Sequence, residues 1–168
     1  MTRLTLLIPV IALAACTKAN PDPDAEYRAP VGTGVNSTQV TTNTLAPNSP
    51  AFFSQTVGDR VLFDVDQYKL NAAGRAVLDG QATWLMTNPE YQIRIEGHAD
   101  EQGTREYNLA LGARRAQAVQ TYLLSKGVSQ SRLKTLSFGK ERPIEICSSE
   151  SCYTKNRRAV TVLAGGIS

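Results

Sequence analysis

The sequence predicts an α/β domain that follows a long polar segment. Two observations favour this class. From Asp59 onward, stretches in which apolar residues alternate, as in β-strands, are followed by stretches in which they recur every three or four positions, as in α-helices. The chain of 168 residues is also long enough for one domain and a tail, and it shows no internal repeat. We therefore expect one domain with the element order βαβαββ.

The first strand and the first helix are expected between Val61 and Asn88. Val61, Phe63 and Val65 alternate along a short strand, so their side chains point to one face. Asn71 is a favourable N-cap for the helix that follows, and Asn88-Pro89 ends this helix. The buried face of the helix is expected to carry Val77, Leu78, Gln81, Ala82 and Leu85.

The second strand contains Tyr91, Ile93 and Ile95, which again alternate. A polar loop from Gly97 to Gly103 follows it. The last two strands are expected at residues 133–138 and 159–163, with a cysteine-containing loop between them.

The second helix is expected from Thr104 to Lys126, because Gly127 is a typical residue just beyond a helix end. Its buried stripe is predicted to consist of Leu109, Ala113, Ala116, Val119 and Leu123.

Residues 1–15 predict an export signal. Arg3 is followed by an apolar run up to Ala15, which is shorter than the roughly 20 apolar residues of a membrane-crossing helix. The run closes with small residues before Cys16, and this ending resembles the lipobox of bacterial lipoproteins. A cysteine at the end of a core helix is the alternative, but core helices seldom lack a polar face over their whole length. We expect cleavage before Cys16 and a covalent lipid on its thiol as the only attached group, with no cofactor.

Residues 16–57 are predicted to form the lipidated N-terminus and a flexible linker, and residues 58–168 the folded domain. Pro, Gly, Thr, Ser and Asn crowd the segment from Pro30 to Pro50, and no charged residue stands between Arg28 and Asp59. A linker of about 42 residues spans ~35 Å as a random coil and up to ~140 Å when extended. The segment from Ala51 to Val57 stays open, because Phe52 and Phe53 could pack on the domain.

Charge and cysteine content narrow the function classes. The formal net charge is only +3, and the sequence lacks the dense basic stripe of nucleic-acid-binding proteins, so no nucleic-acid partner is expected. Cys147 and Cys152 are predicted to form a disulfide, since disulfides persist in exported proteins. Closing so short a loop stabilises by only about 2 kcal/mol. Free thiols or a metal site are the alternative, but two cysteines without a nearby histidine are a poor zinc signature, and no metal is expected.

Several motifs occur in a fixed order from the second strand to the last. They are Ile95-Glu96-Gly97-His98-Ala99-Asp100-Glu101, Tyr107-Asn108-Leu109, Arg114-Arg115-Ala116, Gly139-Lys140, and Lys155-Asn156-Arg157-Arg158-Ala159-Val160. Over about residues 59–164 this series closely resembles the peptidoglycan-binding domain shared by OmpA-like proteins. The resemblance implies a small mixed sheet with helices packed on one face. With the lipobox and linker, the chain is similar to lipoprotein members of this family in Gram-negative bacteria. The cysteines of the loop between the last two strands depart from the family pattern.

A receptor for diaminopimelate, the amino acid of the peptidoglycan stem peptide, needs an acceptor for its ammonium group and a planar donor for its carboxylate. Asp100 and Arg115 can supply these, and the first amides of the following helix offer further donors. Arg115 stands seven residues, or two turns, after Asn108, so both lie on one helix face beside the stripe that begins at Leu109.

The resemblance implies that the matching aspartate and arginine hold diaminopimelate and that Phe63 and Asp64 help to line the pocket. The expected peptidoglycan-binding residues are therefore Asp100, Arg115, Phe63, Asp64, Asn108, Leu109 and Arg158.

Each candidate also has a structural interpretation. Asp100 could cap the helix or pair with Arg105, and Arg115 could be an ordinary exposed arginine. His98 is better explained as a hydrogen-bonded organiser of its loop than as a ligand. Asp64 and Asp66 could form a turn. Arg157 and Arg158 could be a surface pair, or one of them could support the carboxylate site from behind.

The sequence does not favour an enzyme. It has no Gly-x-Ser-x-Gly elbow, two-histidine zinc motif or phosphate loop, and no cysteine placed to act with His98. Asp100 and Glu101 could in principle cleave a glycosidic bond, but adjacent residues rarely face each other across a substrate.

The resemblance implies an outer-membrane lipoprotein whose domain faces the periplasm, where it binds peptidoglycan and serves envelope integrity and cell division with TolB and other Tol proteins. Thr17, where an aspartate would favour inner-membrane retention, agrees with that location. Two alternatives remain, namely a wall-binding lipoprotein without a Tol partner and a periplasmic protein-binding scaffold.

Overall fold

The computed structural model describes residues 45–165. The predicted signal peptide, Cys16 and the linker up to residue 44 lie outside the described residues. In chain order the elements are α1 (Pro50–Phe52), the π-helical turn η1 (Phe53–Gly58), β1 (Arg60–Leu62), α2 (Ala72–Thr87), β2 (Gln92–His98), α3 (Arg105–Ser125), the 3₁₀ turn η2 (Gln130–Arg132), β3 (Leu133–Gly139), α4 (Glu150–Asn156) and β4 (Arg158–Ala164). The predicted α/β class is confirmed. No helix in this part of the chain is both long and apolar enough to cross a membrane.

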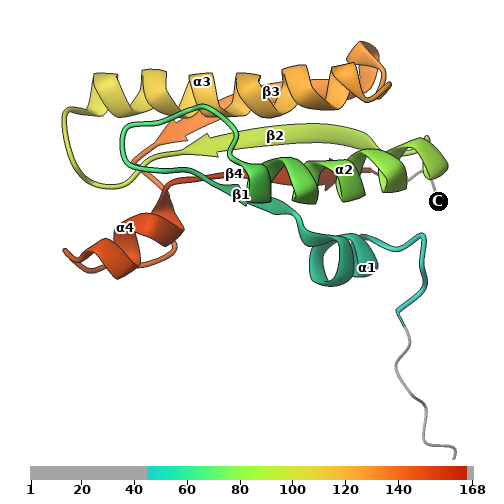
Figure 1. Ribbon diagram of the computed structural model, residues 1–168, viewed down its shortest axis with the longest axis horizontal. Helices are drawn as coiled ribbons and strands as arrows, with labels where there is room; N and C mark the ends of the chain where they lie inside the picture. The colour runs from blue at the N-terminus through green and yellow to red at the C-terminus, as the bar shows by residue number, and fades with distance from the viewer. Residues whose placement is uncertain (1–44, 166–168) are drawn as a thin grey trace, which may run out of the picture. The chain divides into compact units, whose positions relative to one another are not determined.

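The strands form one mixed sheet in the order β1-β4-β2-β3. β2 pairs in parallel with β3 and antiparallel with β4, and β4 pairs antiparallel with β1. α2 packs against β1, α3 packs against β2 and β3, and the two helices contact each other, so both cover the same face of the sheet (Figure 1). The last strand of the chain thus lies inside the sheet, between β1 and β2.

α2 has the predicted cap and the predicted buried face. The Asn71 side chain accepts a hydrogen bond from the Gly74 amide at 2.8 Å, and the helix ends at Thr87. Leu78, Gln81, Ala82 and Leu85 are buried, whereas Val77 is only half-buried. The buried amide of Gln81 donates to the Gly58 carbonyl and accepts from the Thr161 hydroxyl, which satisfies this polar group inside the core.

β1 is shorter than predicted. It ends at Leu62, and Val65, expected on the strand, is 53% exposed. Phe63 is buried as expected, and its amide still bonds to the Arg157 carbonyl. The chain then turns away, with Asp66 at a positive φ of 56°, so the strand pattern does not continue to Val65.

The predicted stripe of α3 is wrong at its N-terminal end. Leu109 is 48% exposed and Ala113 is also exposed, while Ala116, Val119 and Leu123 are buried as expected. The buried face instead begins with Asn108, Leu111, Gly112 and Arg115. Two of these residues are polar and have partners inside the protein. A prediction that counts only apolar residues as buried therefore places the buried face on the wrong side of the first turns of the helix.

The folded part begins before the predicted boundary at residue 58. Phe53 is 1% exposed and joins the hydrophobic core. The Trp84 indole donates to the Pro47 carbonyl at 2.7 Å, and the Tyr91 hydroxyl donates to the Asn48 carbonyl at 2.9 Å. The open segment from Ala51 to Val57 therefore belongs to the packed domain.

α3 and β2 approach each other at two glycines. A Cβ atom on Gly97 would lie 1.8 Å from the Gly112 carbonyl oxygen, which is backbone and cannot rotate away. Glycine at both positions therefore sets the distance between this helix and this strand.

We expect Gly97→Ala to lower the free energy of unfolding by at least about 2 kcal/mol, because α3 has to move off β2. Urea denaturation measures this change. The matched control is Gly80→Ala, where a Cβ would meet only Val57 at 3.7 Å, so a gain of about 0.5–1 kcal/mol in helix propensity is expected. A Gly97→Ala variant as stable as the wild type would contradict this account.

Candidate functional site

A pocket of about 250 Å³ lies at the C-terminal end of β2, beside the first turns of α3. Its lining residues are Val65, Asp66, Asp100, Gln102, Gly103, Tyr107, Asn108, Leu111 and Arg115. Three of the predicted binding residues, Asp100, Asn108 and Arg115, thus meet in one pocket. A larger groove of about 770 Å³ runs along the free edge of β1, but it includes neither Asp100 nor Arg115.

Arg115 is fully buried rather than a free arginine on the surface. Its guanidinium donates to the carbonyls of Gln67 at 2.8 Å, His98 at 2.8 Å and Asp64 at 3.3 Å. Burial lowers the pKa of Arg115 to about 10, and the negative charge of Asp100 opposes this shift, so the group stays charged at neutral pH. A guanidinium has five N–H donors, which leaves two without a partner among the described residues.

The Phe63 ring lies 5.3 Å from the Arg115 guanidinium carbon and supports it from behind. Asp64 contributes only its carbonyl oxygen to Arg115. Neither residue lines the pocket. The prediction that these two line it is therefore replaced by a supporting role, in which they fix the position of Arg115.

Asp100 is buried and already has two partners. One carboxylate oxygen accepts from the Gln102 amide at 3.2 Å, and the other accepts from the Arg157 guanidinium at 3.2 Å. Arg105 pairs with Glu141 at 3.1 Å instead, so the alternative pairing with Arg105 is not formed. Asp100 is thus held as a hydrogen-bond acceptor at the edge of the pocket.

Arg157, and not Arg158, supports the site from behind. Besides Asp100, Arg157 pairs with Glu150 and donates to the Thr154 hydroxyl at 3.0 Å. The Arg158 guanidinium donates to the carbonyls of Asn156 and Arg142 and does not line the pocket. The predicted binding role of Arg158 therefore has no support from its position, and the supporting role behind the pocket belongs to Arg157.

Asn108 lies in the pocket wall, where its side-chain amide donates to the Gln102 carbonyl at 2.7 Å. This bond closes the loop of residues 99–103 onto the helix. Leu109, the next residue, points outward and is absent from the pocket lining. The predicted binding role of Leu109 therefore has no support from its position.

Asp66 and Tyr107 were not in the predicted set, although both line the pocket. The Tyr107 hydroxyl donates to the Asp66 carboxylate, which raises the pKa of Tyr107 above its usual value. Asp66 tolerates the positive φ of this turn, as aspartate often does, so it is both a turn residue and a pocket residue.

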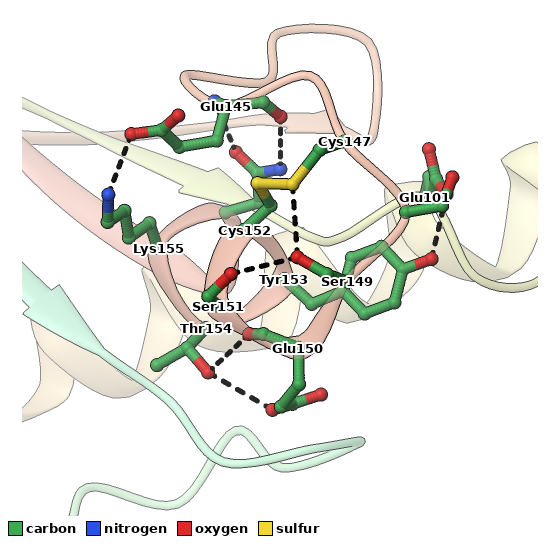
Figure 2. Close-up of a disulfide and its surroundings, with 12 residues drawn as sticks. Glu101, Glu145, Cys147, Ser149, Glu150, Ser151, Cys152, Tyr153, Thr154 and Lys155 are labelled. Atoms are coloured by element: carbon green, nitrogen blue, oxygen red, sulfur yellow. Dashed lines mark hydrogen bonds and ion pairs between the residues drawn. A yellow bond between two sulfur atoms is a disulfide. The ribbon is translucent and has the colours of Figure 1, made fainter.

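A short helix holds the loop of Asp100 in place. The expected disulfide joins Cys147 and Cys152 with a Cα–Cα distance of 5.9 Å. The helix α4, which was not predicted, begins inside the disulfide loop and contains Cys152. Figure 2 shows Tyr153 of this helix reaching Glu101. The Ser148 hydroxyl at 2.7 Å and the Tyr153 hydroxyl at 2.8 Å both donate to Glu101. These two hydrogen bonds, of which the one from Ser148 has the larger effect, hold the pKa of Glu101 below its usual range.

His98 is 2% exposed and stacks on Phe138 at a centroid distance of 5.5 Å. Neither ring nitrogen has a hydrogen-bond partner among the described residues, so the expected role of the ring as a hydrogen-bonded organiser is wrong. Its carbonyl organises the site instead, by accepting from Arg115. Burial, reinforced by the charges of Arg158 and Arg142, lowers the pKa of His98 to about 4. In residues 45–165 no cluster of three or more His, Cys, Asp or Glu residues could hold a metal ion.

The comparisons with known proteins agree with this fold. A family model described as the OmpA family matches residues 62–157. The chain belongs to the OmpA family. The resemblance to lipoprotein members of this family is also confirmed.

The chain is 49% identical over 160 residues to the peptidoglycan-associated lipoprotein of Rhizobium meliloti (strain 1021), with 95% of this chain and 85% of that protein covered. It is 47% identical to the peptidoglycan-associated lipoprotein of Mesorhizobium japonicum, covering 95% of this chain and 89% of that one. The crystal structure of the peptidoglycan-associated lipoprotein from Burkholderia pseudomallei has a TM-score of 0.65 at 36% identity, over 71% of this chain and all of that chain (100%). The C-terminal domain of Helicobacter pylori MotB shares the OmpA-family fold at 22% identity, over 64% of this chain and 84% of that chain, with a TM-score of 0.60.

We expect the free energy of unfolding to decrease as the pH falls from about 6.5 to 4, by up to about 3 kcal/mol. The unfolded chain takes up a proton on His98 near pH 6.5, whereas the folded chain does so only near its lowered pKa of about 4. Stability from this group is therefore complete above pH 6.5 and is lost on acidification. Urea denaturation of wild type and His98→Gln across this range measures it. An equal slope in both proteins would contradict the prediction, since His98 is the only histidine.

Replacing Cys147 and Cys152 by serine is expected to lower the free energy of unfolding by about 2 kcal/mol. Amide hydrogen exchange of residues 99–103 should also accelerate more than that of β2, because Glu101 loses an ordered partner. Unchanged exchange in this loop would show that α4 does not need the disulfide to hold it.

Proposed function

We propose that this protein is a non-catalytic outer-membrane lipoprotein that binds peptidoglycan through the diaminopimelate of the stem peptide and so tethers the outer membrane to the cell wall. The observation that carries the proposal is the meeting of Asp100 and Arg115 in one small pocket. The relatives named peptidoglycan-associated lipoproteins support the wall as the ligand.

The charges of the pocket fit one amino-acid head group. The carboxylates of Asp100 and Asp66 are acceptors for an ammonium group, and they line the same pocket as Arg115. The guanidinium of Arg115 supplies the positive charge that a carboxylate of the head group needs. A pocket of about 250 Å³ suits such a group better than a pair of sugar rings.

The arrangement of the two adjacent acids supports binding rather than catalysis. Asp100 lines the pocket, whereas Glu101 bonds to Ser148 and Tyr153 on the α4 side. Two acids that point to different partners do not face each other across a glycosidic bond.

The proposed lipid anchor and the proposed protein partners are supported by the sequence and not by the pocket. The lipobox that ends at Cys16 supports lipid attachment, and Thr17 supports the outer membrane, with the domain in the periplasm. The similarity to peptidoglycan-associated lipoproteins supports TolB and other Tol proteins as partners, and a role in envelope integrity and cell division.

We expect Asp100→Asn to weaken binding of diaminopimelate-type peptidoglycan by roughly 10- to 100-fold, because a charged hydrogen bond worth roughly 1.5–3 kcal/mol is lost. The full-length protein in mild detergent is titrated with soluble stem peptides, and binding is followed by calorimetry. Glu90→Gln, which removes an exposed carboxylate at the other end of β2, is the matched control.

Stem peptides that contain lysine or amidated diaminopimelate test the role of Arg115, because both lack the carboxylate that Arg115 is proposed to bind. They should bind the wild type about tenfold or more weakly. Equal binding of all three peptides would show that Arg115 is purely structural, and no binding by a folded wild type would refute the proposed function.

A further inference from the structure

A second groove lies next to the pocket, between the segment of residues 68–70 and the helices α2 and α3. Its volume is about 500 Å³. The lining residues are Tyr68, Lys69, Leu70, Arg75, Arg114, Gln117, Ala118, Thr121 and Tyr122. Three of these are cations and none is an acid, so all charged side chains in the lining are positive.

The cations of this groove lack acidic partners, whereas six of the other twelve lysines and arginines among residues 45–165 have one. Carboxylates pair with Arg60, Arg94, Arg105, Lys126, Lys155 and Arg157. Among residues 45–165, no carboxylate pairs with Lys69, Arg75 or Arg114, and all three are exposed. Arg75 donates to the Leu70 carbonyl, and the Arg114 guanidinium lies 5.9 Å from the centre of the Tyr68 ring. This ring orients Arg114 without neutralising it.

The groove and the pocket share a wall. Val65 and Asp66 line the pocket, Tyr68 and Lys69 line the groove, and Gln67 between them gives its carbonyl to Arg115. On α3 the two sites occupy successive turns, with residues 107–115 on the pocket and residues 114–122 on the groove. The lining shifts by seven residues from the pocket to the groove, which corresponds to roughly 10 Å along the helix.

We propose that this groove is a second subsite for the same stem peptide and binds the free α-carboxylate of the γ-linked D-glutamate that precedes diaminopimelate. The inference rests on the proposed function. With the outer end of diaminopimelate in the pocket, its side chain and the γ-linked glutamate extend about as far as four residues of extended chain, roughly 13 Å. This reach is long enough to span the shift of roughly 10 Å between the pocket and the groove, where Lys69 and Arg114 receive the glutamate carboxylate.

The test compares two ligands that differ only at this carboxylate. They are the tripeptide alanyl-γ-D-glutamyl-diaminopimelate and the same tripeptide with the glutamate carboxylate amidated. Free diaminopimelate reports on the pocket alone. The proteins are full-length wild type, a variant with both Lys69→Gln and Arg114→Gln, and Lys134→Gln, which removes an exposed lysine of β3 outside the groove.

We expect the double variant to bind the tripeptide about fivefold or more weakly, and free diaminopimelate within about twofold of wild type. Wild type should discriminate against the amidated tripeptide by the same factor, and the double variant should not discriminate. Lys134→Gln should behave as wild type. Melting temperatures of all three proteins verify that they are folded.

Three outcomes overturn the subsite. The double variant could bind both tripeptides as wild type does, or it could lose free diaminopimelate and tripeptide equally. Wild type could also bind the free and the amidated tripeptide equally, which would show that the groove does not bind this carboxylate. If wild type binds neither free diaminopimelate nor tripeptide, the proposed function itself fails, so the two failures are distinguishable.

Discussion

The buried guanidinium of Arg115 is the interaction on which the site depends. It ties together the turn after β1, through the carbonyls of Asp64 and Gln67, and the end of β2, through that of His98. Burying a cation is costly, and here three carbonyl acceptors, the Phe63 ring and the charge of Asp100 offset that cost. The residue proposed to bind the ligand carboxylate therefore also holds the pocket in shape.

The close contact of Gly97 with Gly112 makes this arrangement possible. Arg115 stands one turn after Gly112 on α3, and Asp100 stands three residues after Gly97. The contact of the two backbones therefore brings the opposite halves of the pocket within reach of one another. Larger side chains would separate the helix from the strand and the two charged groups with it.

Local signals explain what could be predicted from the sequence. The cap at Asn71, the core face of α2 and the alternation in β2 need only neighbouring residues. α4 escaped prediction because its seven residues, Glu150–Asn156, are too few to show a helical period, and Ser149 makes no capping hydrogen bond through its side chain. The choice between Arg157 and Arg158 could not be made, since it depends on Asp100, which is 57 residues away.

The chain enters the domain at one end of β2, and the pocket lies at the other. The Asn48 carbonyl is held by Tyr91, just before β2, whereas Asp100 follows its last residue, and α1 and α4 accordingly lie at opposite ends of the sheet (Figure 1). β2 is flanked by β3 and β4 along both edges. In the tether proposed above, a pull between the anchor and the wall would run along the strand. In this shear direction the hydrogen bonds on both edges bear the load together instead of opening one after another, so the central place of β2 gives the domain mechanical strength in the direction in which a tether is stretched.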